Sequence, residues 1–96
     1  MAQNREIQGP IDTLLEAKMR EMKMDDTVEV TVSLEKPYDF SFQLLSFYLS
    51  EIGVRDYCSL PAFELVVDLH LTRGEIIDIA EQEYVRRIGI VLDDYK

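Results

Sequence analysis

The side chains best suited to nucleophilic or metal chemistry in this sequence are its one cysteine, Cys58, and its one histidine, His70. A cysteine nucleophile needs a base within hydrogen-bond distance and a positively charged or helix-N-terminal environment. The two residues fall in a predicted loop and a predicted strand of a strongly acidic chain, so we do not expect a catalytic pair. Two such ligands are also too few for a structural zinc site within one chain.

Paired aspartates, at 25–26 and 93–94, are the remaining candidates for a metal site. Neither pair lies in the D-x-D-x-D-G pattern of a calcium-binding loop, so solvated turns explain them better. The glycines stand alone and form no phosphate-binding loop, and no G-x-S-x-G nucleophile motif is present. We therefore predict no catalytic residue, no metal ion and no cofactor.

The run Asp68-Leu69-His70, followed by a predicted capped helix, resembles the start of an Smr-type nuclease domain. The glycine that this family carries after the histidine is replaced here by Leu71. In a strand, residues two apart point to the same side, so Asp68 and His70 are expected to share a polar face without a catalytic role. We do not carry the nuclease activity over to this chain.

Composition indicates one globular domain. The chain has 96 residues, of which 47% are hydrophobic and 30% charged, which is ordinary for a folded protein. We expect a flexible N-terminus at residues 1–8 and a single domain at residues 9–96. Its apolar runs are far shorter than the roughly 20 residues of a membrane helix. With no secretory signal and one unpaired cysteine, a cytoplasmic location is expected.

The charge is strongly negative, with a net value of -9 from 19 acidic and 10 basic residues. Basic and acidic residues balance over residues 1–24, so the whole excess follows Met24. A surface this acidic repels phosphate backbones and anionic membranes. We therefore expect no direct nucleic-acid or membrane binding, whereas a basic protein partner would be attracted. The alternative interpretation is that the acidic residues only keep the protein soluble.

The first half of the chain predicts a helix, a strand and a second helix. Apolar residues at helical spacing follow Pro10, which suits the first helical position. Residues 27–34 alternate as a strand with one buried face. The next helix has Asp39 as its expected N-cap and ends at Gly53.

The second half predicts another strand and either a helix or a hairpin. Residues 63–71 alternate, with Phe63 and the odd-numbered residues after it on the buried face. Thr72 and Glu75 form a capping-box pattern that favours a helix reaching Gly89, with a possible short edge strand after it. A hairpin with Gly74 at its tip stays open as the alternative.

These elements predict an α+β fold: a small, single-domain, two-layer α/β sandwich with a minimal sheet and the order α-β-α-β-α-(β). If the two main strands are parallel neighbours, their crossover is expected to be right-handed. The helix at residues 40–52 is apolar over more than half its circumference. Such a helix is central to the core or covered by a second subunit, and we expect both.

The expected function is a non-enzymatic, small acidic protein-interaction module: an adaptor, inhibitor or assembly subunit that is homodimeric or bound to a larger protein. The alternative is an acidic inhibitor that mimics nucleic-acid charge towards a basic nuclease or other nucleic-acid-binding protein. Apolar and methionine side chains adapt to partner surfaces, and carboxylates attract a basic partner. The expected partner-binding residues are Phe47, Tyr48, Met19, Met22, Glu75, Asp78, Glu81 and Glu83.

Overall fold

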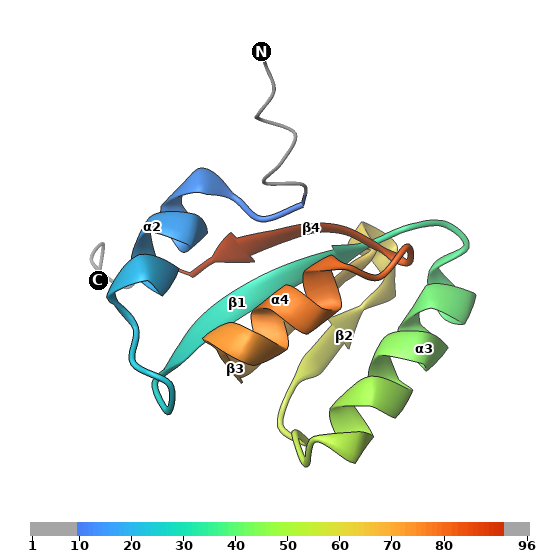
Figure 1. Ribbon diagram of the computed structural model, residues 1–96. Coiled ribbons are helices and arrows are strands. Elements are labelled where there is room, and N and C mark those ends of the chain that lie inside the picture. The colour runs from blue at the N-terminus through green and yellow to red at the C-terminus, as the bar shows by residue number, and fades with distance from the viewer. Residues whose placement is uncertain (1–9, 92–96) are drawn as a thin grey trace.

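The computed structural model describes residues 10–91, which form a layer of helices packed on one face of an antiparallel sheet (Figure 1). The elements in chain order are α2 (Thr13–Glu21), β1 (Thr27–Leu34), α3 (Tyr38–Glu51), β2 (Cys58–Leu60), the 3-10 helix η1 (Pro61–Phe63), β3 (Leu65–Thr72), α4 (Arg73–Ala80) and β4 (Val85–Ile90). This confirms the predicted α+β class and its minimal sheet. The expected flexible N-terminus, residues 1–8, and the pair Asp93-Asp94 lie outside the described residues.

The sheet has the strand order β2-β3-β1-β4, and each neighbouring pair is antiparallel. The two main strands of the prediction correspond to β1 and β3, which are neighbours in the sheet. They are antiparallel, however, because the chain leaves α3, runs along the short edge strand β2 and reverses through η1 before it enters β3. The rule for right-handed parallel crossovers therefore does not apply.

The core lies between the inner face of the sheet and the three helices. The alternating residues of β1 point into it as predicted, and they are buried: Val28, Val30, Val32 and Leu34. Figure 1 shows α4 in the middle of the helical layer, α2 on the side of β4, and α3 on the side of β2. Because α3 lies at the edge of the layer, one side of it has no neighbouring helix.

A β-bulge in β3 corrects the predicted alternation of residues 63–71. Val30 of β1 pairs with Leu69, but Val32 pairs with Val66, so β3 inserts one extra residue between these pairs. Asp68 takes the left-handed conformation there, with φ 62°. The bulge places Val66 in the core instead of Val67. Phe63 was also predicted to be buried, yet it lies in η1 and is exposed.

The segment after Thr72 is a helix, and both bonds of the predicted capping box are present. The Glu75 N–H donates to Thr72 Oγ1 at 3.2 Å, and the Thr72 N–H donates to Glu75 Oε1 at 2.9 Å. The predicted extension to Gly89 is wrong, because α4 ends at Ala80 and residues 85–90 form β4. The predicted helix rested on the spacing of Ile76, Ile77, Ala80, Tyr84 and Ile88, but Tyr84 lies in the turn before β4 and Ile88 is buried on that strand.

Two further element boundaries differ from the prediction. The first helix begins at Thr13, because residues 10–12 instead pair with β4: the Ile88 N–H donates to Pro10 O at 2.8 Å. The second begins at Tyr38, so Asp39 lies in its first turn and is not its N-cap. Gly53 ends that helix as predicted, with φ 84°. Within residues 10–91, none of the helices combines the length and apolar character needed to cross a membrane.

Candidate functional site

The outward side of α3 carries large apolar side chains that the fold leaves uncovered. Phe40, Leu44 and Phe47 are 59%, 39% and 67% exposed. Their spacing of four and three residues places them on the same side of the helix. We call these three residues the outer stripe. The opposite side of α3 packs into the core through Leu45 and Leu49, which are fully buried.

An open groove of about 660 Å³ adjoins the outer stripe. One wall is the turn between β1 and α3, residues 35–37. The first turns of α3 contribute Phe40, Ser41 and Leu44, and the turn between α4 and β4, residues 81–84, forms the opposite wall. The groove and the outer stripe share Phe40 and Leu44, so the two form one continuous surface.

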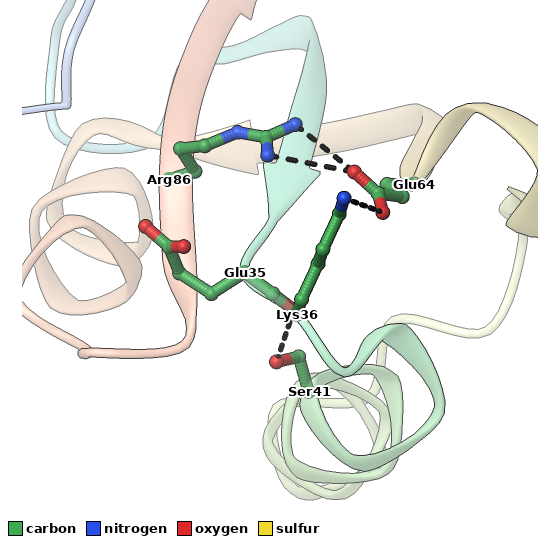
Figure 2. A network of polar contacts seen from close by, with 5 residues as sticks. All are labelled: Glu35, Lys36, Ser41, Glu64 and Arg86. Atoms are coloured by element: carbon green, nitrogen blue, oxygen red, sulfur yellow. Dashed lines mark hydrogen bonds and ion pairs between the residues drawn. The ribbon is translucent and has the colours of Figure 1, made fainter.

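Hydrogen bonds hold the walls of this groove in place. The buried Ser41 hydroxyl donates to the backbone oxygen of Glu35 at 2.7 Å, which ties α3 to the turn that precedes it (Figure 2). The Glu35 N–H donates to Tyr84 O at 2.9 Å and joins that turn to the opposite wall. These bonds fix the backbone of the two walls relative to each other.

Lys36 is the one basic residue in the described lining of the groove, and it pairs with a carboxylate outside that lining. Lys36 Nζ lies 3.8 Å from Glu64 Oε2, and the Arg86 guanidinium lies 3.4 Å from Glu64 Oε1. Figure 2 shows Lys36 reaching to Glu64 on the side away from Ser41. Glu64 is held at this point by its backbone, since its carbonyl accepts the Leu34 N–H at 2.9 Å.

Three glutamates line the groove. Glu35, Glu81 and Glu83 are exposed at its walls. Among residues 10–91, no ion pair within 4.0 Å joins any of these three to a basic side chain. Within the described part of the chain, the groove therefore combines apolar lining residues with three carboxylates that have no basic partner within 4.0 Å, which favours a negative potential there.

Beside the outer stripe, a hydrogen bond connects α3 with α4. The Tyr48 hydroxyl donates to Asp78 Oδ2 at 3.3 Å. Partial burial raises the pKa of Tyr48 to about 12, and the neighbouring carboxylates of Asp78 and Glu75 act in the same direction. Burial also raises the pKa of Tyr84, in the wall of the groove.

This contact gives a testable titration. We expect tyrosinate absorbance to show a component near pH 12 that disappears in Tyr48→Phe and moves to lower pH in Asp78→Asn. The folded protein holds this proton more tightly than the unfolded chain, whose tyrosines titrate near 10. Stability from the protonated phenol is thus complete below pH 10 and is lost as the pH rises through about 12. An unchanged titration curve in Tyr48→Phe above pH 11 would contradict the assignment.

Comparison with protein-family models, curated protein sequences and solved structures finds no match to this chain.

The structure separates the predicted apolar partner-binding residues into two groups. Phe47 is exposed on the outer stripe, and Tyr48 lies half-buried beside it. Met19 and Met22 were expected at the surface, but each is only 6% exposed and packs into the core. Met19 lies on the inner side of α2, and Met22 lies at the C-terminal end of that helix. Their helical spacing therefore reflects packing into the core.

The four predicted acidic residues fall into two groups with different surroundings. Glu75 accepts a hydrogen bond within the capping box, and Asp78 accepts the Tyr48 hydroxyl. Glu81 and Glu83 are at the groove. Sequence reasoning missed Glu35, which joins them there from the far end of β1. Only the folded chain brings that residue next to the turn after α4.

The residues considered for catalysis and metal binding make contacts with other parts of the fold. Cys58 lies exposed on the edge strand β2, and its Sγ contacts Ser59 O at 3.9 Å. His70 pairs across the sheet with Glu29, with Nε2 3.8 Å from Oε1. Asp26 accepts the Lys23 N–H at 2.9 Å in the turn after α2. Over residues 10–91, no cluster of three or more potential ligands is arranged to hold a metal ion.

Proposed function

We propose that this chain is a non-enzymatic protein-interaction module, and that another polypeptide covers the outer stripe of α3. The observation that carries this proposal is the exposure of Phe40 and Phe47, at 59% and 67%, on one side of a helix. Aligned apolar side chains of this size are typical of surfaces that bind other proteins. A second copy of the chain is one polypeptide that could cover the stripe, and the test below includes it.

The free energy available at the outer stripe is sufficient for a hot spot. Complete burial of a large apolar side chain contributes about 1.5–3 kcal/mol. Covering the exposed parts of both phenylalanines therefore contributes on the order of 2–4 kcal/mol before the entropic cost of association. Aromatic residues at the centre of an interface commonly make contributions of this size.

The alternative proposal, an acidic inhibitor that mimics nucleic-acid charge, has weaker support. It depends on the carboxylates of Glu75, Asp78, Glu81 and Glu83 acting together. Two of these already accept hydrogen bonds within the protein, from Thr72 and Tyr48. A charge-driven complex would also weaken steeply with added salt, whereas a complex centred on the outer stripe would tolerate salt.

A matched pair of variants tests the proposed function. Phe47→Ser removes an exposed aromatic from the outer stripe, and Leu14→Ser removes a side chain that is 58% exposed on α2. We expect proteins bound from a cell extract by the immobilised wild type to bind Phe47→Ser at least about tenfold more weakly. Leu14→Ser should bind them like the wild type, and circular dichroism should show that both variants are folded.

Self-association is tested with the same variants. If a second copy covers the outer stripe, sedimentation should show a wild-type dimer that Phe47→Ser dissociates and Leu14→Ser does not. Equal binding by all three proteins, combined with a monomer at every concentration, would rule out the outer stripe as an interface.

A further inference from the structure

We propose that the polypeptide on the outer stripe is a basic amphipathic helix, and that it places a lysine or arginine side chain in the groove between α3 and residues 81–84. This inference rests on the proposed function, because it identifies the partner of the same surface. It adds a chemical class of partner and a position for its charge.

The geometry favours a helix running along α3. The outer stripe extends over two turns, and its first two members, Phe40 and Leu44, also line the groove. A helix that packs along such a row presents apolar residues at i, i+3, i+4 and i+7. A residue flanking that apolar face lies next to the mouth of the groove.

The groove has the chemistry to accept a long basic side chain. Phe40, Leu44 and Pro37 provide apolar contacts for the methylene stem of lysine or arginine. Glu81 and Glu83 can receive the charged end from the opposite wall. The lysine already present there is engaged with Glu64 (Figure 2), so the carboxylates are left without a cation among the described residues.

Charge complementarity distinguishes this partner from a second copy of the chain. Two copies with a net charge of -9 each would bring the same carboxylates of Glu35, Glu81 and Glu83 towards one another. Like charges that face each other across an interface disfavour the complex. An acidic helix would be repelled for the same reason, and a neutral helix would leave the negative potential of the groove uncompensated.

Three synthetic peptides provide the probe. They share one apolar face, with leucine at i, i+3, i+4 and i+7, and a neutral face opposite. The positions flanking the apolar face carry lysine in the first peptide, glutamine in the second and glutamate in the third. Fluorescence anisotropy at physiological ionic strength gives the dissociation constant of each labelled peptide.

We expect the wild type to bind the lysine peptide at least about tenfold more tightly than the glutamate peptide, with the glutamine peptide between them. The double variant Glu81→Gln, Glu83→Gln should reduce this preference to about threefold or less. The matched control Glu21→Gln, Asp25→Asn removes the same amount of charge from an exposed region near the end of α2, and should keep the preference. Equal affinities for all three peptides, or no binding up to about 1 mM, would overturn the inference.

Further comparisons separate this inference from the proposed function. An equal loss of preference in the groove variant and the control would show that net charge, not the groove, selects the peptide, and would also overturn it. Phe47→Ser is expected to weaken all three peptides by a similar factor. If Phe47→Ser weakens binding but the peptides do not differ, the proposed function stands and the basic partner is wrong. If the groove variant changes the preference but Phe47→Ser changes nothing, the outer stripe is not part of the interface.

Discussion

Replacing Leu45 with alanine is expected to lower the free energy of unfolding by about 2–5 kcal/mol. Leu45 is fully buried on the inner side of α3, so the substitution removes apolar contacts and leaves a cavity. For a small domain, this loss is a large fraction of the total stability, which is typically about 5–15 kcal/mol. The adjacent Leu44 is the natural control, because it has the same chemistry and is 39% exposed in the outer stripe.

We expect Leu44→Ala to cost about 1 kcal/mol or less. Urea unfolding followed by circular dichroism gives both free energies of unfolding. If the slope of this free energy against urea concentration is the same in all variants, only the stability differs. Comparable losses at both positions would mean that α3 is buried on both sides. That result would remove the basis for treating the outer stripe as a binding surface.

Replacing Asp68 with valine is expected to cost about 1–3 kcal/mol, although the side chain is exposed. Asp68 occupies the left-handed region with φ 62° at the bulge of β3. Aspartate tolerates this conformation better than most residues, whereas a β-branched side chain is strongly disfavoured in it. Asp68→Gly should retain or slightly raise stability, because glycine adopts positive φ without a steric penalty.

Thermal or urea unfolding of these variants checks the explanation. His70→Ala serves as a control on the same strand and should change stability by about 0.5 kcal/mol or less, since His70 is exposed. Equal destabilisation by Asp68→Gly and Asp68→Val would show that the carboxylate, not the backbone, matters here. The expected result would mean that the backbone conformation at the bulge of β3 explains why Asp68 stands in the run Asp68-Leu69-His70.

Prediction from the sequence succeeded where a local rule decides the structure. Alternation identified β1 and its buried face, the pattern at Thr72 and Glu75 identified the start of α4, and Gly53 marked the end of α3. Each of these features depends on residues within a few positions of one another. A strand, a capping box and a left-handed helix end need little information from the rest of the chain.

Prediction failed at β4, which the sequence pattern assigned to a helix. Tyr84 and Ile88 continue the helical spacing of Ile76, Ile77 and Ala80. In the structure, Tyr84 lies in the turn before β4, and a bulge places the buried residue Ile88 three positions after the buried residue Val85, because Ser33 pairs with Arg87 while Leu34 pairs with Val85. An inserted residue turns a repeat of two into one of three, so the sequence pattern does not distinguish the two cases.

The sequence by itself determined β1, the start of α4 and the end of α3, because alternation, capping and the left-handed glycine at a helix end are local features. Only the tertiary structure decided which apolar side of α3 points inward. A helix that is apolar around most of its circumference has no local preference, and its place at the edge of the helical layer leaves Phe40 and Phe47 uncovered. The groove also required folding, because Glu35 and Glu81 are far apart in sequence and meet only when the turns after β1 and α4 come together.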